Sequence, residues 1–148
     1  MDDMSDVIPE DVVRVALDEG AFLPERAHAT DAGADLRTPR GFVIPPFGWA
    51  TIRTGVHVET PSDHATVLMS KSGLNVRRGI TSTGLIDEGY DGEVVVRLYN
   101  HTPLPRRFGR GDKVSQMVIV PVLYAGFWRA DTIGRGERGG DGFGSTGR

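Results

Sequence analysis

The residues of this chain that could do chemistry gather in five glycine-containing polar segments. Carboxylates, lysines, hydroxyls and an amide recur beside glycine in residues 31–36, 70–74, 84–93, 110–116 and 138–147. Taken singly, each segment is typical of a β-turn, because Asp and Gly are the residues that turns require. Together, their charged groups, hydroxyls and backbone N–H groups would also suit a site for a phosphorylated ligand.

The last segment carries the most specific pattern. Residues 142–147 read Gly-Phe-Gly-Ser-Thr-Gly and match the string G-x-G-x-x-G. A dinucleotide fold needs that string to open a helix after a strand, and we do not expect a helix here. One alternative is an arm that closes over a phosphorylated ligand, with Arg138 on its oxygens and Phe143 on an aromatic ring. The other is a disordered glycine-rich end.

The amino-acid composition limits the classes of function that this chain could have. The 148 residues fit a single domain, 1–148, and the net charge of −3 provides no basic field for a nucleic acid polymer. The absence of cysteine excludes disulfide scaffolds, thiol nucleophiles and Cys-based zinc sites. The four histidines show no metal-ligand spacing, so we expect them at the surface or in structural roles. With no apolar run of membrane length and an acidic start, we expect a cytoplasmic protein with no membrane partner.

The elements that must position these segments are predicted to be strands. Twenty glycines and nine prolines punctuate short apolar runs, which favours an all-β barrel or jelly-roll-like sandwich. The expected strands cover residues 12–17, 41–44, 49–53, 56–59, 65–69, 92–99 and 113–122, with a weak helix candidate over 73–78. Alternation places Val94, Val96 and Leu98 on one aliphatic face, which suits a core.

In this order and at this spacing, the five segments resemble the five motifs of the trimeric dUTPase family, which hydrolyses dUTP to dUMP and pyrophosphate. The most discriminating pieces are Ile86-Asp87-x-x-Tyr90-x-Gly92-Glu93 and residues 142–147. The resemblance covers nearly the whole chain. It implies an all-β, jelly-roll-like (dUTPase-like, β-clip) barrel assembled as a homotrimer, with residues 134–148 as a flexible C-terminal lid.

The resemblance also implies roles for individual residues. Asp87 would be the catalytic general base that activates the attacking water, and Asp35 would reach a Mg²⁺ cofactor through a bound water. Tyr90 would pack beneath the deoxyribose and leave no room for a 2′-hydroxyl, while a narrow hairpin around residues 81–86 would read uracil. The implied substrate-binding set is Lys71, Ser72, Gly73, Thr81, Gly84, Leu85, Ile86, Tyr90, Gln116, Arg138, Phe143, Gly144, Ser145 and Thr146.

Two positions depart from the family pattern. Lys71 stands where the family usually has arginine, and a lysine lacks the forked bidentate grip on phosphate. Thr81 stands where asparagine is common. The family arrangement further implies a site shared by three subunits. One would supply Asp35 together with Asp87 and Tyr90, another Ser72 and Gln116, and a third the tail.

Two alternative functions stay open. A dCTP deaminase-like enzyme shares the fold, but it would place a catalytic glutamate where this chain has Arg97, and arginine cannot shuttle a proton. A nucleotide-gated regulatory protein on the dUTPase scaffold is the second alternative. Because Asp87, Ser72 and Gln116 are all present, such a role would stand beside catalysis, and the sequence contains no convincing insertion for a partner.

Overall fold

A computed structural model describes residues 11–144, 146 and 147. The elements in this part of the chain are short strands and one π-helical segment. Their bounds are β1 (Val15–Leu17), β2 (Ala34–Arg37), β3 (Phe42–Ile44), β4 (Trp49–Arg53), β5 (Val56–Val58), β6 (His64–Met69), η2 (Gly73–Arg77), β7 (Ile80–Thr81), β8 (Thr83–Ile86), β9 (Val95–Asn100), β10 (Arg106–Phe108) and β11 (Lys113–Pro121).

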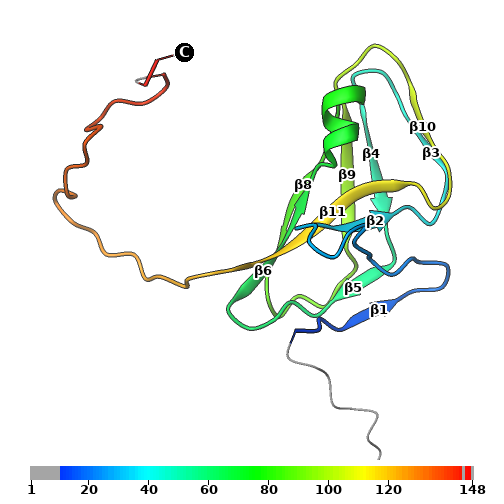
Figure 1. The fold of residues 1–148 in the computed structure, drawn as a ribbon, viewed down its shortest axis with the longest axis horizontal. Coiled ribbons are helices and arrows are strands. Elements are labelled where there is room, and N and C mark those ends of the chain that lie inside the picture. Colours follow the sequence, from blue (N-terminus) through cyan, green and yellow to red (C-terminus); the bar gives the residue numbers. More distant parts are fainter. Residues whose placement is uncertain (1–10, 145, 148) are drawn as a thin grey trace, which may run out of the picture.

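The strands pair antiparallel in small sheets that enclose one core. The largest sheet has the order β2-β11-β6-β8, and a second has the order β4-β9-β7. The pairs β1-β5 and β3-β10 complete the described part of the fold. β11 is the longest strand and lies between β2 and β6, so it brings the second and the fourth polar segments beside each other (Figure 1).

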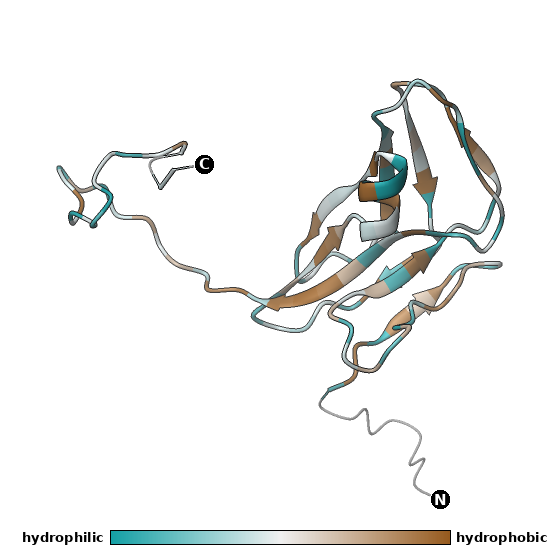
Figure 2. Ribbon diagram, turned by 45° about the horizontal axis from the view of Figure 1, so that its top comes forward, coloured by the Kyte–Doolittle hydropathy of each residue, from teal (hydrophilic) through white to brown (hydrophobic). Residues whose placement is uncertain are grey.

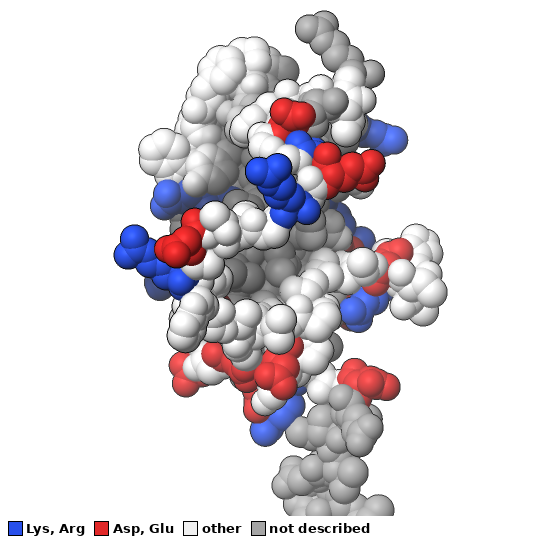
Figure 3. Space-filling view, turned by 90° about the vertical axis from the view of Figure 1, so that its left-hand side faces the viewer, with Lys and Arg blue, Asp and Glu red and all other residues white. Residues whose placement is uncertain are grey.

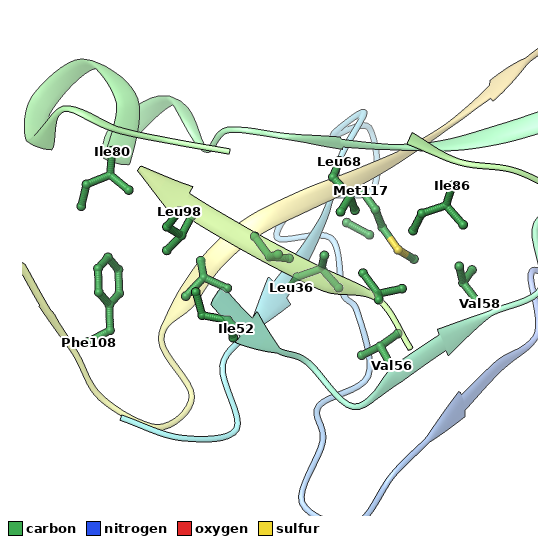
Figure 4. Packing of buried hydrophobic residues seen from close by; sticks show 14 of the residues in the cluster. Leu36, Ile52, Val56, Val58, Leu68, Ile80, Ile86, Leu98, Phe108 and Met117 are labelled. Atoms are coloured by element: carbon green, nitrogen blue, oxygen red, sulfur yellow. The ribbon is translucent and has the colours of Figure 1, made fainter. Parts of the chain in front are cut away.

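The core lies where the aliphatic faces of these sheets meet. Val94, Val96 and Leu98 are each 1% exposed, and they pack with Leu36, Leu68 and other apolar side chains (Figure 4). Buried and exposed residues alternate along β9. Figure 2 shows the hydrophobic residues of the strands in brown. The all-β fold and the aliphatic face predicted for residues 94, 96 and 98 are both confirmed.

All seven expected strands form, with ends that differ from the prediction by three residues at most. The helix candidate is present as η2, a short π-helical segment. Four strands were not expected, namely β2, β7, β8 and β10. They are two to four residues long and rich in polar residues or glycine, so their local pattern resembles that of a turn.

The hairpin expected over residues 81–86 is wrong. β7 pairs with β9, whereas β8 pairs with β6 in the other sheet. The chain therefore passes between sheets at Ser82, whose buried hydroxyl shares a 2.9 Å hydrogen bond with that of Ser115. A buried hydroxyl needs such a partner, so this bond fixes the crossover.

After β11 the chain leaves the body as a long arm (Figure 1). Every described residue from 123 to 147 is exposed, and Phe127 and Trp128 are 102% and 93% exposed. The arm therefore presents large apolar side chains to solvent. In the described part of the chain, no helical segment has the length and apolar character needed to cross a bilayer.

Candidate active site

A buried carboxylate forms the floor of a polar pocket between β2 and β11. Asp35 lies on β2 opposite Gln116 on β11 and is only 6% exposed. One carboxylate oxygen accepts a hydrogen bond from Nζ of Lys71, and the other accepts one from Nζ of Lys113 at 2.9 Å. Two ammonium groups therefore hold one carboxylate.

The two lysines keep Asp35 ionised. Burial acts to raise the pKa of this carboxyl, but the hydrogen bonds and positive charges of Lys113 and Lys71 outweigh it and lower the pKa below its ordinary value. Asp31 and His28, whose side chains are 3.1 Å apart, line the same pocket, so the positive charge is confined to the two ammonium groups beside Asp35. An anionic ligand in this pocket would meet a favourable local field.

The pocket also holds the hydroxyl and amide groups expected to bind phosphate. Ser72 and Gln116 line it with Asp35 and the two lysines. Gln116 is oriented by its side-chain amide, which donates to the carbonyl oxygen of Ser70 at 2.9 Å. Gly33 leaves room for this amide, because a β-carbon at residue 33 would lie 2.1 Å from Oε1 of Gln116 and would displace that side chain. Gly73 follows Ser72 as the exposed first residue of η2.

Lys113 is the site residue that the sequence prediction missed. It lies within the polar segment 110–116, but its spacing from Gln116 does not suggest a shared pocket. A register shift between residues 113 and 115 of β11 changes the pairing with β2. The bulge accounts for the proximity, since it re-aims side chains along the strand.

A second pocket lies between β8 and the start of β9. It is lined by Leu68, Gly84, Leu85, Ile86, Asp87, Tyr90, Glu93, Val94 and Val95. Its wall is mainly aliphatic, and Asp87 stands exposed at its edge. Gly84 keeps the slot open against Leu68, since a β-carbon at residue 84 would lie 2.9 Å from Cδ1 of that leucine. An apolar slot beside a carboxylate suits a flat heterocycle attached to a sugar.

The Tyr90 side chain is fixed by its own loop, residues 87–93. Its hydroxyl donates to the carbonyl oxygen of Glu93 at 3.1 Å. Gly92 lies against the ring, because a β-carbon there would be 2.3 Å from the tyrosine oxygen. Glu93 in turn accepts from the N–H of Gly55 at 2.9 Å and pairs with Arg53 at 3.3 Å. The ring therefore has a defined position at the pocket edge.

Glu88 anchors the first half of the same loop. Its carboxylate accepts from the N–H of Asp63 at 3.2 Å. A hydrogen bond with Tyr124 lowers the pKa of Glu88 and raises the pKa of Tyr124 to about 12. Tyr124 belongs to the root of the C-terminal arm, so the arm root and the loop next to Asp87 are in contact.

The two pockets are far apart in one chain. Asp35 is level with Gln116, Met69 and Thr83 across the sheet. Three strand spacings separate β2 from β8 across the sheet, and Asp87 lies four residues beyond Thr83 in the direction of β8. These two displacements are at right angles, so together they put the Asp35 and Asp87 carboxylates about 20 Å apart. The expectation that Asp35 groups with Asp87 and Tyr90 is therefore wrong for a single chain, because Asp35 shares its pocket with Ser72 and Gln116.

Other expected site residues lie outside both pockets. Thr81 is on β7, and its hydroxyl forms a 2.7 Å hydrogen bond with Nε2 of His101. The tail positions Arg138, Phe143, Gly144 and Thr146 lie on the exposed arm, whereas Ser145 is outside the described residues. Phe143 is fully exposed with φ of 45°.

Arg97, the position that argues against deamination, points away from the core on β9. Its guanidinium lies 5.7 Å from the centre of the Trp49 ring and donates from Nε to Thr51 at 3.1 Å. These contacts are on the outer face of the β4-β9-β7 sheet and not in the aliphatic slot. The position therefore offers no group for proton transfer to a bound base.

The comparisons with known proteins agree with this geometry. A family model described as dUTPase matches residues 19–147. The chain belongs to the dUTPase family. A Thermobifida fusca deoxyuridine 5′-triphosphate nucleotidohydrolase is 42% identical over 135 residues, which cover 88% of this chain and 75% of that protein.

Solved structures place the fold in the same family. The dUTPase of Staphylococcus bacteriophage 80alpha with dUpNHpp has a TM-score of 0.85 and 28% identity, covering 93% of this chain and 99% of that one. A variant of the dUTPase of S. aureus phage phi11, which coordinates a structural Mg(II) ion, has a TM-score of 0.77 and 27% identity over 83% of this chain and 99% of its own. The dUTPase fold predicted from the motifs is thus confirmed.

The family's substrate class agrees with the distribution of charge. On the face drawn in Figure 3, basic and acidic side chains are interspersed, and neither sign dominates it. The positive charge that matters for a triphosphate is instead local, at the two lysines beside Asp35. A small anionic ligand needs only such a local cluster, whereas a nucleic acid polymer would need an extended basic surface.

Proposed function

We propose that this chain hydrolyses dUTP to dUMP and pyrophosphate at sites formed where copies of the chain meet. The observation that carries the proposal is the division of the expected machinery into two pockets that share no lining residue. Ideal strand spacings put their carboxylates about 20 Å apart on one chain. One half has the positive charge and the polar groups for a triphosphate, and the other has the apolar slot and the carboxylate. A second copy that brings its phosphate pocket against the slot of the first would complete the site.

In the phosphate half, the residues present suit a chelated nucleotide. Lys71, Ser72 and Gln116 would bind phosphate oxygens together with Lys113. When triphosphate oxygens arrive, the ammonium groups have new anionic partners, and Asp35 is left with free oxygen atoms. An ionised carboxylate of this kind accepts hydrogen bonds from the water shell that Mg²⁺ retains. Mg²⁺ would neutralise part of the triphosphate charge and favour the release of pyrophosphate.

The other half would hold the nucleoside and the water. Asp87 at the edge of the slot would orient the attacking water and accept its proton. Tyr90 would lie flat against the deoxyribose, where a 2′-hydroxyl would meet its ring. Backbone groups of residues 84–86 would hydrogen bond to uracil, and the approach of Gly84 to Leu68 leaves little space for a 5-methyl group.

The arm would supply the cover. We propose that residues 134–148 fold over the loaded site, with Phe143 on uracil and Arg138 on the triphosphate. The exposure of the described arm residues supports a segment that finds its contacts on another copy of the chain or on the substrate. Its ordering costs free energy, which contacts with the loaded site must offset. This proposal also makes the chain an oligomer, with three copies to a site as in the family pattern.

The direct test is incubation of the protein with Mg²⁺ and, in parallel, dUTP, dCTP, dTTP or UTP, scoring both pyrophosphate and ammonia. We expect pyrophosphate from dUTP alone. Ammonia from dCTP would overturn the proposal in favour of deamination.

The Asp87→Asn variant tests the assigned base, because asparagine keeps the shape but cannot accept the proton. We expect kcat to fall by about a hundredfold or more, in line with the loss of a general base. An unchanged kcat would contradict the role of Asp87. As a matched control, Asp131→Asn on the exposed arm should retain the parent rate.

A further inference from the structure

His57 joins the middle of the 87–93 loop to the opposite edge of the body. It lies on β5 opposite Ala16 of β1. Its Nδ1 is 3.0 Å from the carbonyl oxygen of Asp91, and its Nε2 is 3.1 Å from Oδ1 of Asp18. The Asp18 backbone is held, because its N–H donates to the carbonyl oxygen of Gly55 at 2.8 Å, while its side chain is 59% exposed. The imidazole therefore connects the Asp18 carboxylate to the loop that carries Tyr90.

The two contacts require a proton on each ring nitrogen. A carbonyl oxygen and a carboxylate oxygen are both acceptors in this pair of hydrogen bonds, so Nδ1 and Nε2 must both donate. Neutral histidine has one N–H and can make only one of these bonds. The observed geometry is therefore that of the imidazolium, and its loss of a proton must release one of the two contacts.

The charges around His57 favour the imidazolium. The hydrogen bond to the backbone of Asp91 is the largest cause that raises the pKa of His57, followed by the hydrogen bond to Asp18, and the charges of Asp18 and Glu93 add to it. The cavity beside the ring also contains Arg14 and Glu59, which pair with each other at 3.6 Å. Glu93 likewise has a cationic partner, Arg53.

Glycines flank the middle of the loop on both sides. Gly89 adopts φ of +84° and Gly92 flanks Asp91 on the other side, so both neighbours of the Tyr90-Asp91 pair have wide backbone freedom. Glu88 and Glu93 hold the two ends of the loop, as described above. In its middle, the Tyr90 N–H donates to the carbonyl oxygen of Asp87 at 3.3 Å, and the bond from His57 holds the carbonyl of the next residue, Asp91.

We propose that His57, as an imidazolium, is a positioning residue that holds the 87–93 loop in the shape that receives the sugar, so that substrate affinity depends on its proton. This inference rests on the proposed function of Tyr90 and Asp87. The imidazolium with both hydrogen bonds is fully present at low pH. It is lost as pH rises through the pKa of His57, and in the folded protein this pKa lies above 6.5. Above that pH the loop loosens and KM rises, while kcat changes less.

The test compares steady-state kinetics of the parent and two variants with dUTP from pH 5.5 to 9. His57→Asn keeps an amide donor near the position of Nδ1 but does not titrate. At each pH, kcat/KM of the parent is divided by that of the variant, which cancels the effect of titrating the nucleotide itself. We expect the ratio of kcat/KM to fall about three- to tenfold from low to high pH, mainly through KM, as loss of a partly exposed charged hydrogen bond predicts. Asp18→Asn should move this fall to lower pH.

The control is His64→Asn, which removes a histidine bonded to the carbonyl oxygen of Ser62 and should keep the parent profile. In NMR, the amide signals of residues 90 and 91 should titrate with the same midpoint as the His57 ring, without substrate. The inference would be overturned if the parent-to-variant ratio of kcat/KM did not change with pH in an active enzyme. It would also be overturned if the amide signals of residues 90 and 91 did not follow the titration of His57. A parent that releases no pyrophosphate from dUTP at any pH would instead overturn the proposed function.

Discussion

Asp35 shows how one carboxylate can serve two states of a site. Without a ligand, its negative charge neutralises half of the positive charge of Lys71 and Lys113 and keeps both side chains in the pocket. With a triphosphate present, the lysines have a stronger anionic partner. The departure from arginine at residue 71 fits this arrangement, because a lysine presents a compact charge that one carboxylate oxygen can satisfy.

Substituting Asp35→Asn should destabilise the protein at neutral pH. The change leaves two neighbouring ammonium groups without their anion, which we expect to lower the free energy of unfolding by about 1–3 kcal/mol. Because the pKa of Asp35 is lowered in the folded state, its contribution is present above the ordinary value of 3.8 and is lost as pH falls through the folded pKa. Urea unfolding at pH 7 and pH 3 measures this, and the difference between the two proteins should shrink at pH 3. Equal stabilities at pH 7 would contradict the assignment.

Gly92 matters to the position of Tyr90 more than to stability. In a Gly92→Ala variant the new methyl group meets the far end of the tyrosine side chain, which can swing away at little cost to folding. We expect nearly unchanged thermal stability but a KM for dUTP raised by about tenfold, together with weaker discrimination against UTP. Gly126→Ala is the matched control, since a β-carbon there meets nothing within 4 Å. A variant that binds dUTP as tightly as the parent would show that Tyr90 does not act there.

At the scale of the element, β9 separates two functions on its two faces. Its inner face supplies Val96 and Leu98 to the core, while its outer face carries Val95, Arg97 and Tyr99. Val96→Ala should lower the free energy of unfolding by about 2 kcal/mol, from lost burial and the cavity left behind. Val95→Ala makes the same chemical change on the exposed face and should cost less than about 0.5 kcal/mol. Chemical denaturation monitored by circular dichroism distinguishes the two.

The two longest of the predicted strands have enough alternating residues to show a period. β9 and β11 are such strands, because several successive apolar positions mark their inner faces. β2 and β8 were missed because Asp35 and Gly84 interrupt short runs, and these are the residues that the two pockets need. Local conflict with strand preference is expected at functional positions.

The pairing of strands could not be predicted from the local pattern. Residues 81–86 were expected to form a hairpin, whereas β7 and β8 each pair with a distant partner, β9 and β6. The same limit applied to the site. The family resemblance led to Asp35, Lys71 and Gln116 as expected site residues, but only the register across β2 and β11 brings Lys113 to the same carboxylate.

For the whole molecule, the distance between the two pockets leads to the proposal that assembly is part of catalysis. A mixture of Asp87→Asn and Asp35→Asn chains tests this. If the two carboxylates act from different chains, co-folded mixed oligomers contain some sites with one intact residue from each. Random mixing in equal amounts would give activity of about a quarter of the parent's, although each variant alone is inactive. Activity no greater than that of the separate variants would show that both groups act within one chain.

Because the arm is exposed, tryptophan fluorescence can report on its position. The chain has two tryptophans, Trp49 and Trp128, and both are exposed in the single chain, at 58% and 93%. Neither belongs to the buried core, so melting of that core should change tryptophan emission little. Seating of the arm on a neighbour or on bound nucleotide would move Trp128 from water to an apolar surface and shift its emission to shorter wavelength. Fluorescence is thus a selective optical signal for the arm.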